Sequence, residues 1–435
     1  MILVDLQIAA RNLLLHTRRN LLLAGAVGTV TAILVVLGGF TDGIRSAMLE
    51  SATALMTGHV NVGGFYKITS SVAAPLVSDY QRVLDETRHL VPEIDYVTAR
   101  ERGYAKAVSE RSSMNLVLAG IDVAQEPGLW RNLRLKQGKL DDLRTPGTIL
   151  LFEDQAKRLE VGVGDVITLS APTARGVNNT EDLRVVAVAR NLGILSSFTA
   201  FLPSQAVRGL YHQSSTATGA LHLHLKDPSR AGQVAARLRD GLGRAGWRVM
   251  DADADVWWMK LMKRVNAEDW TGQKLDMSTW EDELSFLNWI LSAIGAISGA
   301  LLFVLLVIVV IGILNSLAIA IRERTREIGT LRAIGMQRRK VLWLFLLESM
   351  MLGVAGAAGG SLIGAAVAAG VNGMHVAVPE SMQMFLMQQH LTLAVDGRGV
   401  LARALFVVLV TTVAALAPAF SAARLKPITA IHHIG

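Results

Sequence analysis

The charged side chains between positions 322 and 340 are the residues best suited to recognition chemistry in this chain. Two acids stand among seven cations, which are Arg322, Arg324, Arg326, Arg332, Arg338, Arg339 and Lys340. Guanidinium groups form strong paired hydrogen bonds with carboxylates, so the segment is suited to bind an acidic protein surface. Such an excess of Lys and Arg in a short loop is also typical of the cytoplasmic side of a membrane protein.

Motifs for catalysis and for metal binding are absent from the sequence. It contains no Gly-x4-Gly-Lys-Ser/Thr, no His-Glu-x-x-His and no Gly-x-Ser-x-Gly. It also contains no cysteine, which excludes disulfides, thiolate catalysis and cysteine-based zinc sites. We therefore expect a non-catalytic chain with no catalytic residues, no metal site and no bound cofactor.

Composition indicates a protein that is partly embedded in a membrane and partly soluble. The mean hydropathy is +0.39 with 51% hydrophobic residues, which is too apolar for an ordinary soluble protein, yet 18% of residues are charged. The net charge of +7 could suggest nucleic-acid binding. Many of the cations lie in 322–340 and 11–19, where the positive-inside rule explains them, so we expect no nucleic-acid partner.

Four apolar stretches predict transmembrane helices, at 21–40, 284–321, 341–371 and 404–423. The first resembles a signal peptide, but its uncharged stretch is longer than the usual apolar region, which predicts an uncleaved span. The second has no charged residue and would measure about 57 Å at 1.5 Å per residue. A bilayer core is about 30 Å thick, so this helix should cross near 296–318 and extend beyond the membrane on one side.

Sidedness follows from the basic residues. The segments 1–20, 322–340 and 424–435 are predicted to be cytoplasmic, and 41–283 and 372–403 to lie outside. This is the topology of a multi-pass membrane protein with both termini in the cytoplasm. The fold class expected is four transmembrane α-helices plus a large extracytoplasmic (periplasmic) α+β domain.

The outer segment 41–283 is long enough to hold a core of its own, or two. Strands are predicted at 148–152, 166–169, 183–189 and 220–225, and helices at 81–90, 155–159 and 230–242. Strand signals in both halves suggest a second subdomain, whose boundary the sequence does not place. His222 and His224 share one face of a predicted strand, usually the solvent side.

The segment 326–335 is the sharpest local pattern. Ile328, Leu331 and Ile334 share one helical sector, which an interfacial amphipathic helix explains as well as a coupling helix that docks a cytoplasmic motor. In the coupling interpretation, Gly329 and Gly335 allow another protein to approach closely.

Several segments then resemble one family. They read RTREIGTLRAIG at 324–335, FLLES at 345–349, LFEDQAKRL at 151–159, VGVGD at 161–165 and FLP at 201–203. Together they resemble the FtsX-like permeases, the membrane subunits of mechanotransmitting ABC transporters. RRN at 18–20 and GHVNV at 58–62 are most similar to the lipoprotein-releasing (LolC/LolE-type) branch.

The resemblance implies partners and site residues. It implies a cytoplasmic ABC ATPase dimer that binds ATP and Mg²⁺, a second permease copy or paralogue, a lipid or lipoprotein substrate, and a periplasmic acceptor. ATPase coupling would fall on Arg324, Arg326, Glu327, Ile328, Gly329, Leu331, Arg332, Ala333 and Gly335.

Three functions remain open at this point: extraction of lipoproteins or other amphiphiles from the outer leaflet, export of a drug, peptide or toxin through an adaptor and outer-membrane channel, and regulation of a cell-wall hydrolase. An amphiphile needs apolar shelter, since each CH₂ moved into water costs about 0.8 kcal/mol. We expect that shelter where the first two spans leave the outer leaflet, at Leu37, Phe40, Met48, Phe286, Ile290 and Ile294.

The third span has residues suited to packing inside the membrane. Gly356, Gly360 and Gly364 repeat at four-residue spacing, which permits close helix contact within one chain or across a dimer. Glu348 is an acid well inside the span, and we expect it to anchor a neighbouring helix or a loop arginine rather than relay protons.

Overall fold

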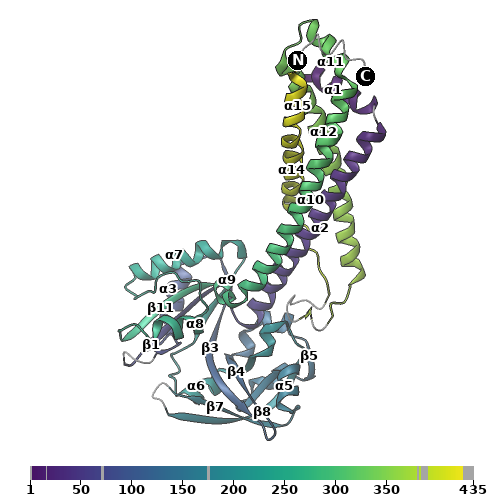
Figure 1. The fold of residues 1–435 in the computed structure, drawn as a ribbon. Helices are drawn as coiled ribbons and strands as arrows, with labels where there is room; N and C mark the ends of the chain where they lie inside the picture. Colours follow the sequence, from purple (N-terminus) through teal and green to yellow (C-terminus); the bar gives the residue numbers. More distant parts are fainter. Residues whose placement is uncertain are drawn as a thin grey trace. The chain divides into compact units, whose positions relative to one another are not determined.

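A computed structural model of the chain describes residues 2–15, 17–69, 73–173, 177–379, 382–383 and 390–424 (Figure 1). The chain divides into two compact units. A helical unit combines residues 1–46, 291–377 and 390–435, and an α/β unit combines residues 47–290 and 378–389. This architecture confirms the predicted fold class.

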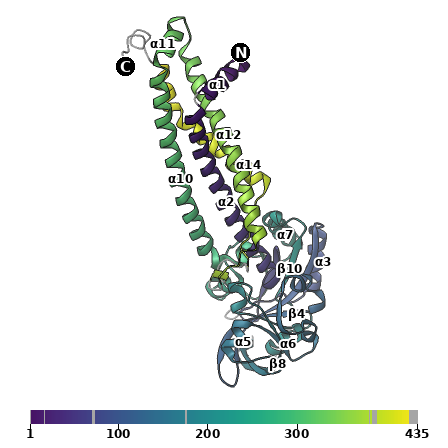
Figure 2. The ribbon, with the colours of Figure 1, turned by 90° about the vertical axis from the view of Figure 1, so that its right-hand side faces the viewer.

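Long helices make up the helical unit (Figures 1 and 2). Its elements are α1 (Ile2–Leu15), α2 (Thr17–Leu55), α10 (Asn288–Glu323), α11 (Thr325–Ala333), α12 (Arg338–Met374), α14 (Gly397–Ala414) and α15 (Leu416–Ala423). Four stretches of the described helices are long and apolar enough to cross a membrane: 17–53, 292–323, 338–374 and 397–423.

The helices differ from the predicted spans at their ends. The first starts before 21 and continues past 40 to Leu55, and the third extends beyond 341–371 at both ends. The second begins at Asn288 instead of 284, after a short 3-10 turn. The fourth starts before 404 and breaks at Ala415. Hydropathy reports the lipid-embedded part of a helix, whereas the helix itself continues wherever its backbone hydrogen bonds can.

The core of the helical unit lies where four helices meet. Buried side chains from α2, α10, α12 and α14 form one apolar cluster, which includes Val27, Val30, Leu34, Val309, Ile313, Leu352 and Val407. On α12, the predicted glycine repeat packs against α2 of the same chain. A Cβ on Gly356 would lie 2.8 Å from the carbonyl oxygen of Ala24, and one on Gly364 would lie 2.8 Å from Val35 Cβ.

Gly360 makes the tightest of these contacts, because a Cβ there would collide with the backbone carbonyl of Gly28. Gly359, the next residue, has open space where its Cβ would be. We predict that Gly360→Ala destabilises the protein by about 1–3 kcal/mol, the usual range for overpacking. Gly359→Ala should be neutral or slightly stabilising, because alanine favours a helix. Thermal unfolding of the purified variants measures both, and equal effects would contradict the packing assigned here.

The first half of the α/β unit is an antiparallel sheet in the order β11-β1-β10-β3. The strands are β1 (Val60–Lys67), β3 (Ile94–Val108), β10 (Ala220–Leu225) and β11 (Gly272–Thr279), and the short β2 (Ala73–Ala74) pairs with β1. Helices α3 (Tyr80–Leu90) and α7 (Ala231–Arg244) pack together, and α7 packs on β1 and β11. Further short helices are α8 (Trp257–Lys260), continued by a wider turn over Leu261–Val265, and α9 (Trp280–Glu283).

The second half is a small closed barrel. Its strands are β4 (Ser113–Ile121), β6 (Thr148–Phe152), β7 (Val166–Pro172), β8 (Asn178–Ala189) and β9 (Thr199–Pro203), with β5 (Leu135–Gly138) added to β8. Adjacent strands pair in the order β3-β4-β9-β6-β8-β7, and β7 pairs again with β3, which closes the barrel. Helices α4 (Pro127–Asn132), α5 (Glu153–Leu159) and α6 (Ser204–Tyr211) complete this half.

The long strand β3 joins the two halves. Its residues up to Arg100 pair with β10, and those from Glu101 onward pair with β4. The subdomain boundary that the sequence left open therefore falls within one continuous strand.

The expectation that His222 and His224 face solvent was wrong. Every residue of β10 is buried, so segments packed on both faces of the strand cover it, and both imidazoles lie in the interior. Burial, reinforced by the positive charge of Arg100, lowers the pKa of His224 to about 3 and holds the pKa of His222 well below its usual value. Both rings are therefore neutral members of a buried polar layer.

Candidate coupling site and membrane cavity

Helix α11 is held against the ends of α12 and α15. Ile328 is buried in a cluster with Val341, Phe345, Ala419, Ala422 and Ala423. Gly329 is also buried, which leaves no room there for another protein. At the other end, Gly335 has a φ of +103°, a left-handed conformation that glycine adopts readily, and the chain turns there before α12.

A buried polar contact fixes the start of α11. Arg324 Nη1 donates to Glu348 Oε1 at 3.1 Å, and Asn12 Nδ2 donates to the same oxygen at 2.6 Å. The side chains of Arg324 and Glu348 are only 11% and 9% exposed. The acid predicted as an anchor thus joins α12 to the start of α11 and to α1.

The nine predicted coupling residues separate into two groups. Arg324, Ile328 and Gly329 face inward, and Arg332 is half-buried and donates to the carbonyl oxygen of Ala423 at 2.8 Å. The residues left exposed are Arg326, Glu327, Leu331, Ala333 and Gly335.

The exposed side of α11 combines a carboxylate with apolar side chains. Leu331 is 40% exposed and Ile334, just after the helix, is 79% exposed. Leu331 and Ile334 lie four and seven residues after Glu327, about one and two helical turns, so they are on the same side of the helix as Glu327. We call Glu327, Leu331 and Ile334 the docking face.

The buried ion pair allows a direct test of what holds this face. Glu348→Leu leaves the Arg324 guanidinium buried without its carboxylate, which we expect to cost about 3–5 kcal/mol of stability. The double variant Arg324→Leu/Glu348→Leu should be less destabilised, since no lone charge remains. Glu323→Leu is the matched control, because its pair with Arg19 is solvent-exposed and contributes about 1 kcal/mol or less. Thermal unfolding would contradict the assignment if Glu323→Leu were as damaging as Glu348→Leu.

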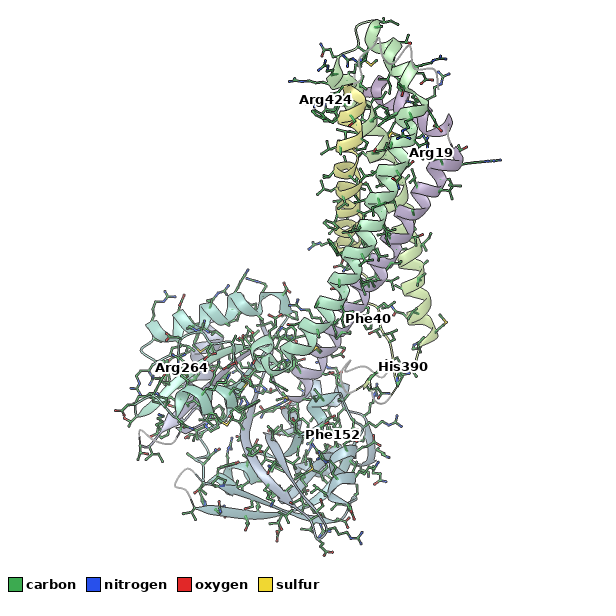
Figure 3. All side chains as sticks on the ribbon, in the orientation of Figure 1. Arg19, Phe40, Phe152, Arg264, His390 and Arg424 are labelled. Carbon is green, nitrogen blue, oxygen red and sulfur yellow. The ribbon has the colours of Figure 1, made fainter. Side chains whose placement is uncertain are left out.

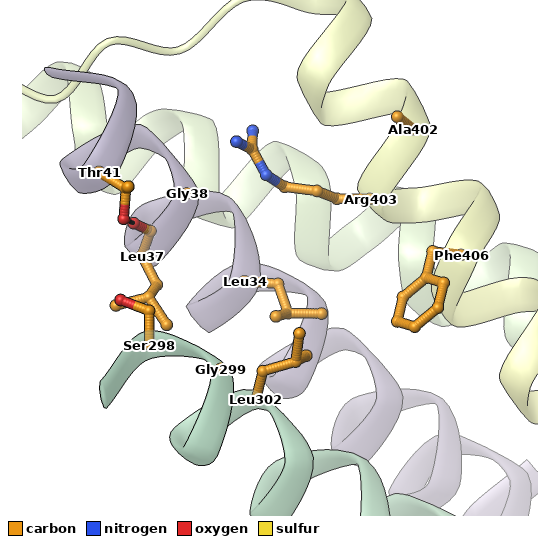
Figure 4. A pocket seen from close by; sticks show the side chains of 10 residues that line it. All are labelled: Leu34, Leu37, Gly38, Thr41, Ser298, Gly299, Leu302, Ala402, Arg403 and Phe406. Atoms are coloured by element: carbon orange, nitrogen blue, oxygen red, sulfur yellow. Dashed lines mark hydrogen bonds between the residues drawn. The ribbon is translucent and has the colours of Figure 1, made fainter. Parts of the chain in front are cut away.

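A second site lies between α2, α10 and α14, as an apolar cavity of about 340 Å³ (Figure 4). Its lining is Leu34, Leu37, Gly38, Thr41, Ser298, Gly299, Leu302, Ala402, Arg403 and Phe406. All ten residues belong to the helical unit. Arg403 is the cation among them and extends from α14 toward α2 (Figure 4).

Of the six residues predicted to shelter an amphiphile, Leu37 lines this cavity. Met48 is buried in the α/β unit, so the expectation that it contacts lipid was wrong. Phe286 is partly exposed and packs against Phe198 and Trp258, and its contact with lipid stays a prediction. Phe40 and Ile294 are partly exposed but lie outside the cavity lining, and the side chain of Ile290 lies outside the described residues.

Sequence reasoning missed the contribution of α14. Arg403 was placed at the end of a loop, although a cation at the outer edge of a span departs from the positive-inside pattern and was a usable signal. Phe406 and Leu302 lie in continuous apolar runs, where nothing in the sequence separates residues that line a cavity from those that face lipid.

Comparison with known protein families identifies the C-terminal part of the chain. Residues 299–427 match the family described as FtsX-like permease C-terminal. This part of the chain is an FtsX-like permease domain. It contains α11, α12 and α14, and therefore the docking face, Glu348 and Arg403.

Relatives extend the similarity beyond this domain. The chain is 37% identical over 154 residues to the macrolide export ATP-binding/permease protein MacB of Nitrobacter winogradskyi, covering 35% of this chain and 20% of that protein. It is 24% identical over 397 residues to MacB of Wolinella succinogenes, covering 87% of this chain and 55% of that protein. The chain thus spans about half or less of these relatives.

The periplasmic region of MacB from Actinobacillus actinomycetemcomitans is a solved structure with 16% identity, covering 46% of this chain and 88% of that one at a TM-score of 0.29. The match to the FtsX-like family does not distinguish its branches, so assignment to the lipoprotein-releasing branch stays a prediction.

Proposed function

We propose that this chain is the permease subunit of an ABC transporter, and that a partner ATPase dimer moves it by pushing on α11. The docking face is the observation that carries this proposal. Exposed apolar side chains beside a carboxylate suit a protein contact. The same helix is fixed from behind by Ile328 and by the Arg324–Glu348 pair, so a force applied to it passes to α12.

The end of the helical unit that carries α11 faces the cytoplasm in this proposal. Arg19 and Arg424 lie toward the same end of the unit, and Phe40 lies toward the other (Figure 3). The cations of 322–340 add to that basic end, as the positive-inside rule requires. The α/β unit is then extracytoplasmic, in a bacterial inner membrane, and this chain acts on ATP only through its partner.

The substrate we infer is an amphiphile of the outer leaflet. The cavity offers apolar walls from three helices at a depth where acyl chains lie, and among the described spans α10 is the least buried. Its exposed side suits lipid or a second permease copy. Release of a lipoprotein, with a periplasmic acceptor, is the narrower form of this proposal.

The second candidate is export of a drug, peptide or toxin. It is favoured by the relatives, two of which are named as macrolide export proteins. Both candidates use the same ATPase coupling, and they differ in whether the cavity holds a lipid chain.

Coupling can be tested at the docking face. Leu331→Asp should reduce transport-linked ATP hydrolysis by the reconstituted complex at least tenfold, because a charge replaces an apolar contact at the interface. Val163→Asp changes a similarly exposed residue in the α/β unit and should leave coupling intact (Val163 is 43% exposed). Full coupling in Leu331→Asp, measured as ATP hydrolysed per transport event, would overturn the proposal.

Amphiphile binding can be tested by filling the cavity. Gly299 has open space where its Cβ would be, so Gly299→Phe should occupy the cavity without a backbone clash. We expect this variant to lose stimulation of the partner ATPase by added lipid. Gly312→Phe on the same helix also enters open space but lies outside the cavity lining, and it should retain stimulation. Normal stimulation in Gly299→Phe, with drug stimulation lost, would favour the export candidate.

A further inference from the structure

Arg403 reaches across the mouth of the cavity from one helix to another. Its Nη2 donates to Asp42 Oδ2 on α2 at 2.6 Å. The side chain passes Gly38, one turn before Asp42, where any Cβ would collide with the guanidinium group. Because glycine has no side chain, Gly38 leaves a notch in the surface of α2. The Arg403 guanidinium group lies in this notch and so reaches the rim of the cavity.

The depth of this cation in a bilayer can be judged from three helices. Counted from the basic end, Thr41 lies 22 residues beyond Arg19, Ser298 lies 24 residues before Arg322, and Arg403 lies 21 residues before Arg424. At 1.5 Å per residue these separations are about 32–36 Å. A hydrocarbon core is about 30 Å thick, so all three estimates place Arg403 at the level of the far headgroups.

The guanidinium group has hydrogen-bonding capacity left over. Its Nη1 is buried and has no hydrogen-bond partner among the described residues. Its carboxylate partner among the described residues, Asp42, is 54% exposed, and a pair with so exposed a carboxylate contributes little stability. Asp42 can therefore give way to another anion at small cost.

A cation at headgroup depth above an apolar cavity matches the two parts of a phospholipid. Arginine binds phosphate through parallel N–H···O bonds, and the cavity walls contributed by Leu34, Leu302 and Phe406 suit an acyl chain. We propose that this site binds one phospholipid, with the phosphate on Arg403 in place of Asp42 and an acyl chain in the cavity. The proposal rests on the proposed function only for the placement in the membrane.

Binding can be measured by native mass spectrometry of the full-length chain. The probes are dioleoyl phosphatidylglycerol and dioleoylglycerol, which share their acyl chains and differ in the phosphate. Wild type should retain phosphatidylglycerol at least tenfold better than dioleoylglycerol, the scale of one charge-assisted hydrogen bond. Arg403→Gln should lose this preference.

Asp42→Asn separates a binding site from a structural ion pair. It removes the competing carboxylate, so retention of phosphatidylglycerol should rise, while Asp42→Asn/Arg403→Gln should match Arg403→Gln. Equal retention of the two lipids by wild type, or a loss of retention in Asp42→Asn as large as in Arg403→Gln, would overturn the proposal.

The assay needs no ATPase, so its outcome is independent of coupling at α11. Selective binding together with normal coupling in Leu331→Asp would overturn the proposed function alone. Unselective binding with coupling lost in Leu331→Asp would overturn the lipid site alone.

Discussion

The carboxylate of Glu348 is the constraint on which the arrangement of the helical unit depends. A charge this far inside an apolar helix is costly unless it is paired, and here the pair comes from outside the helix. Because Arg324 precedes α11 and Asn12 lies on α1, satisfying one acid brings three segments together. The inward side of α11 is thereby committed to the fold, and its outward side is free for a partner.

The two long helices that lead toward the α/β unit are held very differently. Helix α2 packs tightly on α12, because Gly28 and Gly360 bring the two backbones into contact. A third (33%) of the apolar stretch of α2 is buried, against 11% for α10. If a partner pushes on α11, the tightly packed pair of α2 and α12 suits the role of a rigid frame. The loosely packed α10 suits the role of the helix that moves or contacts a second copy.

The sequence revealed features that depend on local pattern. Apolar length identified the four spans, a short apolar run identified β6 and alternation identified β10, the two strands at their observed ends, because each signal arises within a few residues. Which residues share a cavity depends instead on how separate helices pack. Leu37 was identified from its depth alone. The sequence could have singled out Arg403 as a cation at the outer edge of a span, but its reach past Gly38 to the cavity depends on how α14 packs against α2. Likewise, the burial of His222 depends on the segments that pack on both faces of β10, which the strand's own alternation does not report.

An arginine–carboxylate pair stands at each end of the helical unit, and their burial separates their roles. Removing one partner of the Arg324–Glu348 pair would leave a charge away from water, so that pair must stay closed for the fold to persist. In the Arg403–Asp42 pair the carboxylate is 54% exposed, so another anion can replace Asp42 on the guanidinium group. The first pair suits a joint that transmits force without opening. The second opens at little cost, which is what a site that takes up and releases a charged headgroup requires.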